Sequence, residues 1–300
     1  MLRYHYLFTY SLTQLPTYSL THSLPYSLTH SLTHSLTQSH THAFTPLLPY
    51  SLTHFLTHAQ AYCSQKTYLT RDFTGPTDGF VATYAINSDK TSGDVTGYIG
   101  YLPSTESIYV VYRGSSSISN WIADLDAFKV TYTSWPECNC EVHKGFYLSE
   151  QGVIDDVKSE VFSLLNQFPN YDVKLTGHSL GAAMAQLTSM DLIKAGIPVT
   201  SVYNFGQPRV GDYNYADFAS GKVNTFRVTH YQDIVPHVPI TTAMEFYHAC
   251  TEEYEDKNGS LKTCTDTCED PSCADQWKAY QWSAEDHMTY LGLYMDCSSV

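Results

Sequence analysis

The sequence predicts an α/β fold with a mainly parallel central sheet flanked by helices, and three observations lead to it. Strand-like segments alternate with helix-like segments over residues 109–229, an order that is typical of parallel sheets. A turn with glycines on both sides of a serine, residues 177–181, joins a predicted strand directly to a predicted helix. The chain has 300 residues, 43% of them hydrophobic, which is enough for one domain with a large core.

The individual elements follow from the spacing of apolar residues. Short apolar runs predict buried strands at residues 109–112, 172–176, 201–205 and 225–229. Helical spacing predicts a helix over residues 146–168, with one apolar side formed by Val153, Val157, Val161, Leu164 and Leu165. A second helix is predicted over residues 182–195, and His248 is expected on a further strand.

Charge and cysteine content exclude some classes of protein. The formal net charge is -14, which argues against nucleic acid or an anionic membrane as an electrostatic partner. The eight cysteines include no C-x-x-C pair, so disulfides in an oxidising compartment are expected rather than a zinc site. These residues alone leave the pairing of the cysteines open.

Residues 1–58 differ from the rest of the chain. The tetrad Ser-Leu-Thr-His begins at positions 19, 27, 31 and 51, and prolines interrupt the repeats. Such a segment has no regular apolar face, so we expect it to be disordered or processed. Its histidines follow the repetition and do not predict a metal site. The globular domain is therefore expected over residues 59–300.

Residues 59–61 have the small-x-small form of a signal-peptidase site. The stretch before them lacks a basic start, but together with the cysteines it favours a secreted protein. The sequence has no run of about 18 apolar residues, so no transmembrane helix is predicted.

The turn Gly177-His178-Ser179-Leu180-Gly181 matches the pattern G-x-S-x-G. Between a strand and a helix, this pattern presents a serine hydroxyl as a nucleophile on a strained turn that flanking glycines make possible. The alternative is an ordinary strand-to-helix turn with an incidental serine, which the context makes the weaker interpretation. Ser179 is the candidate nucleophile.

A serine nucleophile needs a base, and the base needs an acid that orients it. In this arrangement the acid and then the histidine follow the serine in the chain. The histidines after Ser179 are His230, His237, His248 and His287. His287 is the best candidate because it is far enough along the chain to return from a separate loop. Asp233, just after a predicted strand, is the candidate acid; Asp212, Asp217 and Asp286 are competitors that are more simply surface charges.

Several motifs in order resemble those of the fungal-type class 3 triacylglycerol lipases. The resemblance covers roughly residues 61–297, and its motifs lie at residues 110–115, 120–121, 142–146, 177–183, 204–211, 233–236 and 286–287. It implies an α/β-hydrolase fold with Ser179, Asp233 and His287 as the triad. It also implies an oxyanion hole formed by Ser115 and the backbone N–H of Leu180. Without the resemblance, Ser115 would be a turn residue.

The resemblance implies further details. A bridge between the chain ends would join Cys63 to Cys297, and a bridge before the catalytic histidine would join Cys264 to Cys273. The pairing of the other four cysteines stays open: Cys138, Cys140, Cys250 and Cys268. We expect His143 and His178 to pack and hydrogen-bond near the site without transferring protons.

Residues 116–125 look like the lid of this family. Ile118, Trp121, Ile122 and Leu125 lie at positions i, i+3, i+4 and i+7, which gives a short helix one apolar stripe. The alternative is a helix facing the core. We favour a lid because the stripe directly follows the oxyanion residue, so that it would cover the site in water and rest on lipid when open.

The predicted function is hydrolysis of acylglycerol esters through an acyl-enzyme at a lipid–water interface. No cofactor or metal is expected, the substrate is a lipid or another ester, and the protein is expected to be a monomer. Fold similarity leaves the substrate open. The alternatives are a feruloyl or other carboxylic esterase, a phospholipase A1, a non-catalytic lipid-binding relative and, more remotely, a peptidase.

Overall fold

The computed structural model describes residues 53, 60–70, 72–88, 95–115, 117–123, 125–264 and 267–297. Pro46–Val300 form one compact unit. Apart from Thr53, the predicted N-terminal segment 1–58 lies outside the described residues, so its boundary stays a prediction. The predicted cleavage site also lies partly outside them.

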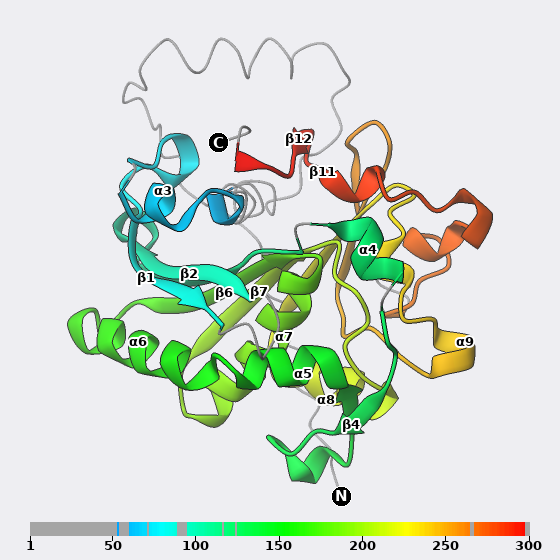
Figure 1. Cartoon of the computed structure of the whole chain (residues 1–300), viewed down its shortest axis with the longest axis horizontal. Coiled ribbons are helices and arrows are strands. Elements are labelled where there is room, and N and C mark those ends of the chain that lie inside the picture. Colours follow the sequence, from blue (N-terminus) through cyan, green and yellow to red (C-terminus); the bar gives the residue numbers. More distant parts are fainter. Residues whose placement is uncertain are drawn as a thin grey trace, which may run out of the picture. The chain divides into compact units, whose positions relative to one another are not determined.

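Among the described residues, eight strands form one mixed sheet (Figure 1). Its order is β1-β2-β3-β6-β7-β8-β9-β10, and the five strands from β3 to β9 run parallel to one another. The outer strands β1, β2 and β10 pair antiparallel. The bounds are β1 Val81–Asn87, β2 Thr96–Leu102, β3 Ser107–Tyr112, β6 Asp172–His178, β7 Val199–Phe205, β8 Thr225–His230, β9 Glu252–Glu255 and β10 Leu261–Cys264. This architecture confirms the predicted fold class.

Two small sheets accompany the main one. Strands β4 (Lys129–Thr131) and β5 (Glu141–His143) pair with each other, as do β11 (Thr289–Tyr290) and β12 (Leu293–Tyr294). The described helices are α3 Gln65–Thr70, α4 Ile118–Ala123, α5 Lys144–Gln151, α6 Ile154–Gln167, α7 Leu180–Lys194, α8 Tyr213–Ser220 and α9 Thr241–Met244. Short 3₁₀ turns are η1 Gln60–Tyr62, η2 Gly75–Thr77, η3 Pro103–Thr105, η4 Pro136–Cys138, η5 Val235–His237, η6 Ala274–Gln276, η7 Ala279–Gln281 and η8 Asp286–Met288.

The side chains of β3 show how the sheet separates two cores. All six residues of β3 are buried, as is typical of a parallel strand covered on both faces. Because successive side chains point to opposite faces, Val110 and Tyr112 join the core beneath α5, α6 and α7, whereas Tyr109 and Val111 join the core beneath η1 and α3. Figure 1 shows α5, α6 and α7 on one face of the sheet and α3 on the other.

Helix α7 is buried around most of its circumference. Its buried residues run from Gly181 to Leu192, and it contacts β3, β6 and β7 as well as α5. A helix that is apolar on nearly all sides belongs in the core of a large domain. The residue that precedes α7 is therefore fixed by packing on several elements at once.

Two of the sequence predictions need correction. The helix predicted over residues 146–168 is divided into α5 and α6 at Gly152 and Val153, because glycine has a low helix propensity. Of its predicted apolar side, Val153, Val157, Val161 and Leu164 are buried and Leu165 is partly buried. His248 lies before β9 rather than on a strand, and its neighbour Tyr247 makes only an isolated bridge to Gly211.

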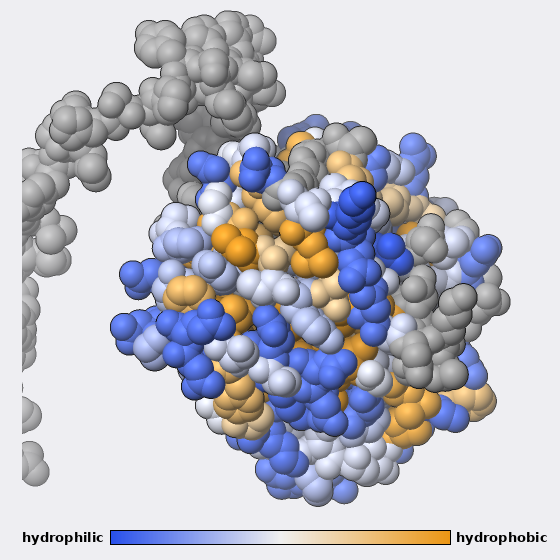
Figure 2. All heavy atoms as spheres, turned by 60° about the vertical axis from the view of Figure 1, so that its left-hand side comes forward, coloured by the Kyte–Doolittle hydropathy of each residue, from blue (hydrophilic) through white to orange (hydrophobic). Residues whose placement is uncertain are grey.

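The face of the molecule seen in Figure 2 is mixed in character. Figure 2 shows hydrophilic residues over much of the face in view, with hydrophobic residues in separate patches, which is ordinary for a folded chain. None of the described helices has the length and apolar character needed to cross a membrane.

Replacing a fully buried side chain of α7 tests this packing. Leu187 is 0% exposed, so we expect Leu187→Ala to lower the free energy of unfolding by about 2–5 kcal/mol through the cavity it leaves. The matched control is Leu69→Ala, at a side chain that is 37% exposed, with an effect within about 0.5 kcal/mol. Urea unfolding of the disulfide-bonded chain measures both, and equal effects would contradict the described burial.

Candidate active site

Ser179 lies on a sharp turn between β6 and α7. Its backbone has φ 59° and ψ -130°, a strained conformation that is typical of the serine in a nucleophile elbow. A Cβ on Gly177 would lie 2.2 Å from the carbonyl oxygen of Gly181, and one on Gly181 would lie 2.4 Å from that of Tyr112. The two glycines are therefore needed for the close approach of the turn to its own helix and to the end of β3.

Asp233 and His287 form a buried hydrogen-bonded pair. Nδ1 of His287, in η8, lies 2.8 Å from Oδ2 of Asp233, which follows β8. The other carboxylate oxygen of Asp233 accepts a hydrogen bond of 2.8 Å from the backbone N–H of Val235. The Tyr290 hydroxyl donates to the same Oδ2 that holds His287. Two donors other than the imidazole, the Val235 N–H and the Tyr290 hydroxyl, thus hold the carboxylate, and the carboxylate orients the imidazole.

Burial raises the pKa of Tyr290 well above its ordinary value, and the negative charge of Asp233 raises it further. The hydroxyl therefore keeps its proton and acts as a permanent donor to the carboxylate. A buried carboxylate that accepts several hydrogen bonds is suited to orienting a histidine.

The remaining polar atoms of the candidate triad are buried and unpaired. Ser179 Oγ and His287 Nε2 have no hydrogen-bond partner in the described part of the chain, and both residues are 0% exposed. His178 connects Ser179 with His287. It directly precedes Ser179 in the chain, and its ring stacks on the His287 ring with centroids 4.2 Å apart. Hydrogen bonds of this kind often form only when substrate binds.

His178 is held from both sides. Its Nε2 lies 2.8 Å from the carbonyl oxygen of His287, and its Nδ1 lies 2.6 Å from the Tyr62 hydroxyl. Gly206 is also close to His287, because a Cβ on Gly206 would lie 2.7 Å from the His287 Cε1. His178 thus packs and hydrogen-bonds beside the site, as the sequence predicted for it.

The two predicted oxyanion residues adjoin Ser179. Ser115 follows Gly114, where a Cβ would come within 2.9 Å of the Ser179 Cβ. Leu180 is the first residue of α7, so its backbone N–H is one of those that an α-helix leaves without an internal partner. The positive end of the helix dipole therefore faces the same place.

The predicted lid is a helix of six residues, α4. Ile118, Trp121 and Ile122 are partly buried, and the Trp121 ring stacks on Phe146 of α5 with centroids 6.2 Å apart. Ser116 and Asp124, within the predicted lid, lie outside the described residues. The helix is shorter than the predicted segment 116–125, but the apolar stripe is present.

A pocket of about 350 Å³ lies between α4 and α5. Apolar side chains dominate its lining, chiefly those of Trp121, Leu125, Phe128, Phe146, Leu148 and Leu180. Leu180 lines the pocket and directly follows Ser179 in the chain, so the pocket adjoins Ser179. Its size and lining suit an apolar ligand.

His143 belongs to the wall of this pocket. Its Nδ1 accepts a hydrogen bond of 3.3 Å from the N–H of Phe146, at the beginning of α5, and its ring stacks on the Phe146 ring. Burial lowers the pKa of His143 to about 4. It is therefore neutral at neutral pH and supports the wall.

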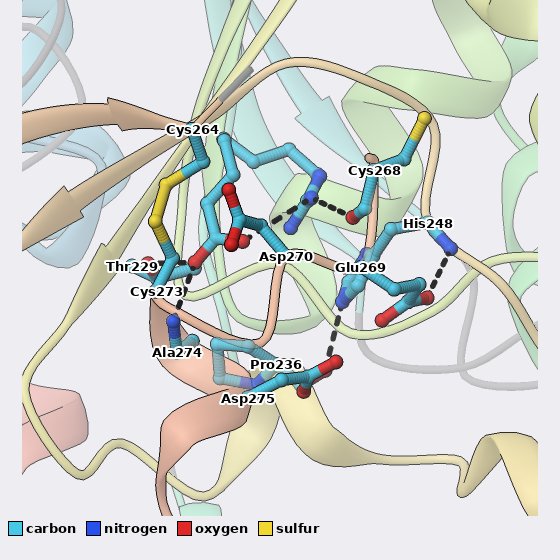
Figure 3. A network of polar contacts seen from close by, with 12 residues as sticks. Thr229, Pro236, His248, Cys264, Cys268, Glu269, Asp270, Cys273, Ala274 and Asp275 are labelled. Atoms are coloured by element: carbon cyan, nitrogen blue, oxygen red, sulfur yellow. Dashed lines mark hydrogen bonds and ion pairs between the residues drawn. A yellow bond between two sulfur atoms is a disulfide. The ribbon is translucent and has the colours of Figure 1, made fainter. Parts of the chain in front are cut away.

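The loop that follows Asp233 rests on a buried network of charges (Figure 3). Arg209 makes two hydrogen bonds of 2.9 and 2.7 Å to Glu269 and one of 3.3 Å to the carbonyl of Pro239. His248 Nε2 lies 2.8 Å from the carbonyl oxygen of Pro236. Bidentate guanidinium–carboxylate pairs of this kind fix geometry well.

Burial would raise the pKa of Glu269, but the hydrogen bonds from the Arg209 guanidinium and the charges of Arg209 and Arg227 hold it below its ordinary value. The contribution of Glu269 to stability is therefore present above its ordinary pKa and is lost as the pH falls through the lower folded-state pKa. The support of the acid loop therefore persists across neutral pH.

The four disulfides are Cys63–Cys297, Cys138–Cys140, Cys250–Cys268 and Cys264–Cys273. The first and last confirm the pairs that the resemblance implied. Cys264 and Cys273 lie beside Asp270 in an arrangement that could hold a metal ion, but their sulfurs are already joined to each other (Figure 3). The disulfide accounts for this cluster.

The sequence did not identify Tyr62 and Tyr290. Tyr290 lies three residues after His287, and the hairpin of β11 and β12 turns it back toward Asp233. The short distance along the chain from Tyr290 to the predicted base His287 could have indicated that Tyr290 belongs to the site. Tyr62 is 116 residues before His178, and no local pattern relates the two.

Removing the Tyr290 hydroxyl tests the support of Asp233. We expect Tyr290→Phe to lower the free energy of unfolding by about 1.5–3 kcal/mol, because a buried hydrogen bond to a charged group is lost. Thermal or urea unfolding measures the change. The control is Tyr280→Phe, at a side chain 88% exposed, and a Tyr290 variant as stable as that control would contradict the described bond.

The comparisons with known proteins agree with this geometry. Residues 109–243 match the family described as "Lipase (class 3)". A lipase of Rhizomucor miehei is 37% identical over 207 residues, covering 67% of this chain and 56% of the relative. The secreted mono- and diacylglycerol lipase A of Penicillium camembertii is 36% identical over 166 residues, covering 55% and 53%. The chain thus spans about half the length of these relatives.

A solved triacylglycerol lipase, described as having a serine protease triad as its catalytic centre, superposes with a TM-score of 0.77. It is 30% identical, and the match covers 86% of this chain and 98% of that one. With the order of the motifs and the elbow at Ser179, this similarity shows that the chain belongs to the class 3 lipase family.

Proposed function

We propose that the protein is a serine ester hydrolase that cleaves acylglycerol esters at a lipid–water interface. The observation that carries the proposal is the buried Asp233–His287 pair beside the elbow of Ser179, next to an apolar pocket. These are the three groups that acyl transfer requires: a nucleophile, a base and the acid that orients the base.

In the first half of the reaction, Ser179 Oγ attacks the carbonyl carbon of the ester, and His287 Nε2 takes the hydroxyl proton. Asp233 keeps the imidazole in the tautomer that leaves Nε2 free, because Nδ1 is its hydrogen-bond partner. His287 then gives the proton to the departing alcohol. An acyl group remains on Ser179.

In the second half, water takes the place of the alcohol. His287 removes a proton from the water, whose oxygen attacks the acyl carbon, and the fatty acid leaves as Ser179 regains its proton. Both tetrahedral oxyanions are stabilised by Ser115 and by the N–H of Leu180, at the beginning of α7. Each donor contributes about 3 kcal/mol in comparable sites.

The pocket between α4 and α5 would hold an acyl chain. Trp121, Phe146 and Leu148 line it, and Leu180 connects it to the nucleophile. The names of the relatives, a lipase and a mono- and diacylglycerol lipase, support acylglycerols as the substrate class.

Burial of the candidate triad supports action at an interface. Ser179 and His287 are fully buried, and Trp121 of α4 lines the same pocket as Leu180, the residue after Ser179. We expect α4 to move before an ester reaches Ser179, and Ile118, Trp121 and Ile122 then to contact the lipid surface.

A secreted location fits the same proposal. All the cysteines are paired, as in proteins of oxidising compartments, and a relative is named as secreted. We expect the mature protein to act as a monomer.

Loss of the nucleophile is the direct test. We expect the protein to hydrolyse emulsified tributyrin and triolein, and Ser179→Ala to lower the rate by at least about 10⁴-fold. Ser159→Ala, on the exposed side of α6, is the matched control and should keep full activity. If the folded wild type cleaves neither emulsion, assays with aryl esters and phospholipids separate an esterase and a phospholipase from a non-catalytic binding protein.

The lid proposal makes a separate prediction. Trp121→Ala removes the ring that packs on Phe146 in the closed state and would contact lipid in the open state. We expect the ratio of activity on emulsified to dissolved tributyrin to fall about tenfold, as for the loss of one large apolar contact. A ratio equal to that of wild type and of Tyr280→Ala would contradict a lid role.

A further inference from the structure

Two buried carboxyl groups face each other behind the pocket. Glu150, on α5, is 0% exposed, and Asp191, on α7, is 4% exposed. Helix α5 forms one wall of the pocket, and α7 begins directly after Ser179. The two carboxyls therefore lie between the pocket wall and the helix that holds the nucleophile.

The side chain of Gln151 shows how close the two groups are. Its Nε2 donates to Glu150 Oε2 at 2.8 Å and to Asp191 Oδ2 at 3.1 Å. Asp191 also accepts hydrogen bonds from Ser134 Oγ at 3.1 Å and from the Tyr132 hydroxyl at 3.4 Å. One amide group thus bridges Glu150 and Asp191.

One oxygen of this cluster lacks a donor. Glu150 Oε1 is buried and accepts no hydrogen bond from any described residue. A carboxylate has only acceptor oxygens, whereas a protonated carboxyl carries one O–H donor. A proton on Glu150 would therefore convert a contact between two acceptors into a hydrogen bond to Asp191.

The groups around the pair do not neutralise two negative charges. The titratable and charged groups that act on Glu150 or share its surroundings are Asp191 on α7, Lys158 on α6, Tyr112 on β3, Tyr147 on α5, Tyr215 on α8, and Tyr132 between β4 and β5. Lys158, which is half-buried, is the cation that acts on Glu150. Lys194 on α7 is exposed and donates to the carbonyl of Ser134, whose hydroxyl bonds to Asp191. Two carboxylates this close and this deep cannot both ionise at low cost.

The electrostatic balance at Glu150 agrees with this geometry. Burial raises the pKa of Glu150 to about 8, and the charge of Asp191 raises it too, while the hydrogen bond from Gln151 and the charge of Lys158 oppose the rise. The pKa values of Tyr132 and Tyr215 are raised well above the ordinary value by burial and by the same carboxyls, so these hydroxyls stay protonated and supply no further negative charge.

We propose that Glu150 and Asp191 share one proton at neutral pH, and that this proton holds the pocket wall α5 against the nucleophile helix α7. Glu150 is thereby a positioning residue, which touches no substrate. The part of the inference that concerns stability is independent of the proposed function, and the part that concerns activity rests on it.

The sign of the pH dependence follows from linkage. The folded-state pKa of Glu150 lies above its ordinary value of 4.5, so folding takes up a proton between that value and about 8. Stability contributed by the pair is complete below pH 4.5, falls as the pH rises, and is lost above the folded-state pKa. Above that pH both carboxyls are charged, and their repulsion separates α5 from α7.

Replacement by glutamine tests the shared proton. Glu150→Gln keeps the shape and supplies a permanent N–H donor toward Asp191. Urea unfolding of the full chain is measured from about pH 5 to about pH 9 for wild type, Glu150→Gln and the exposed control Glu141→Gln. We expect the unfolding constant of wild type to rise by up to about tenfold per pH unit relative to Glu150→Gln, and to level off near pH 8. A ratio that does not change with pH would overturn the proposal.

A spectroscopic readout covers the case in which the variant does not fold. Infrared absorption of the wild type at neutral pH should show the C=O band of one protonated carboxyl, which disappears as the pH is raised through about 8. Absence of that band at neutral pH would overturn the proposal without any variant.

The activity measurement separates this inference from the proposed function. At pH above about 8, Glu150→Gln should keep activity on emulsified tributyrin that the wild type loses, while Glu141→Gln loses it like the wild type. An equal loss in all three proteins would show that the pair does not position the pocket wall. If no protein has esterase activity at any pH, the proposed function fails, while the unfolding and infrared results still decide the shared proton.

Discussion

The backbone of Ser179, held at φ 59° between β6 and α7, is the constraint on which the geometry of the site depends. A non-glycine residue in this conformation costs on the order of 1–3 kcal/mol. The packing of α7 against β3, β6, β7 and α5 offsets that cost. This close packing requires Gly177 and Gly181, because a Cβ at either position would collide with backbone atoms. The strain and the core packing are therefore parts of one arrangement.

The other groups of the site are placed relative to this turn by buried polar contacts. His178, the last residue of β6, stacks on the His287 ring, and its Nε2 hydrogen-bonds to the carbonyl oxygen of His287. Asp233 holds the other side of His287, and the Arg209–Glu269 pair and His248 support the loop that follows Asp233. Segments from the middle and the end of the chain thus converge on one histidine, and Cys63–Cys297 joins the ends of the described domain.

Local patterns were sufficient to predict much of this arrangement. The strand-to-helix turn predicted the nucleophile, and the order of Ser179, Asp233 and His287 along the chain predicted a pair that the structure places 2.8 Å apart. The roles of these residues stay proposals. Periodicity predicted the apolar side of α6 and the strands β3, β6, β7 and β8, but it did not reveal the break at Gly152, because the apolar spacing continues across it.

Contacts between distant residues could not be predicted in the same way. The bond of Tyr62 to His178, the pairing of Cys250 with Cys268 and the proximity of Glu150 to Asp191 depend on how distant segments pack together in the folded chain. Glu150 is instructive because its position on the helix predicts neither burial nor a second carboxyl beside it. Only the packing of α5 on α7 brings the two groups together.

The central claim is that Ser179 is an activated nucleophile covered by α4, and the rate at which a serine-directed phosphonate labels it tests this most directly. We predict slow labelling in buffer and rapid labelling when detergent micelles or emulsified lipid are added, with the phosphonate found by mass spectrometry on Ser179 alone. Labelling that is equally fast without an interface would contradict the covered site. A folded protein that is never labelled at Ser179, or is labelled at another residue, would contradict its assignment as the nucleophile.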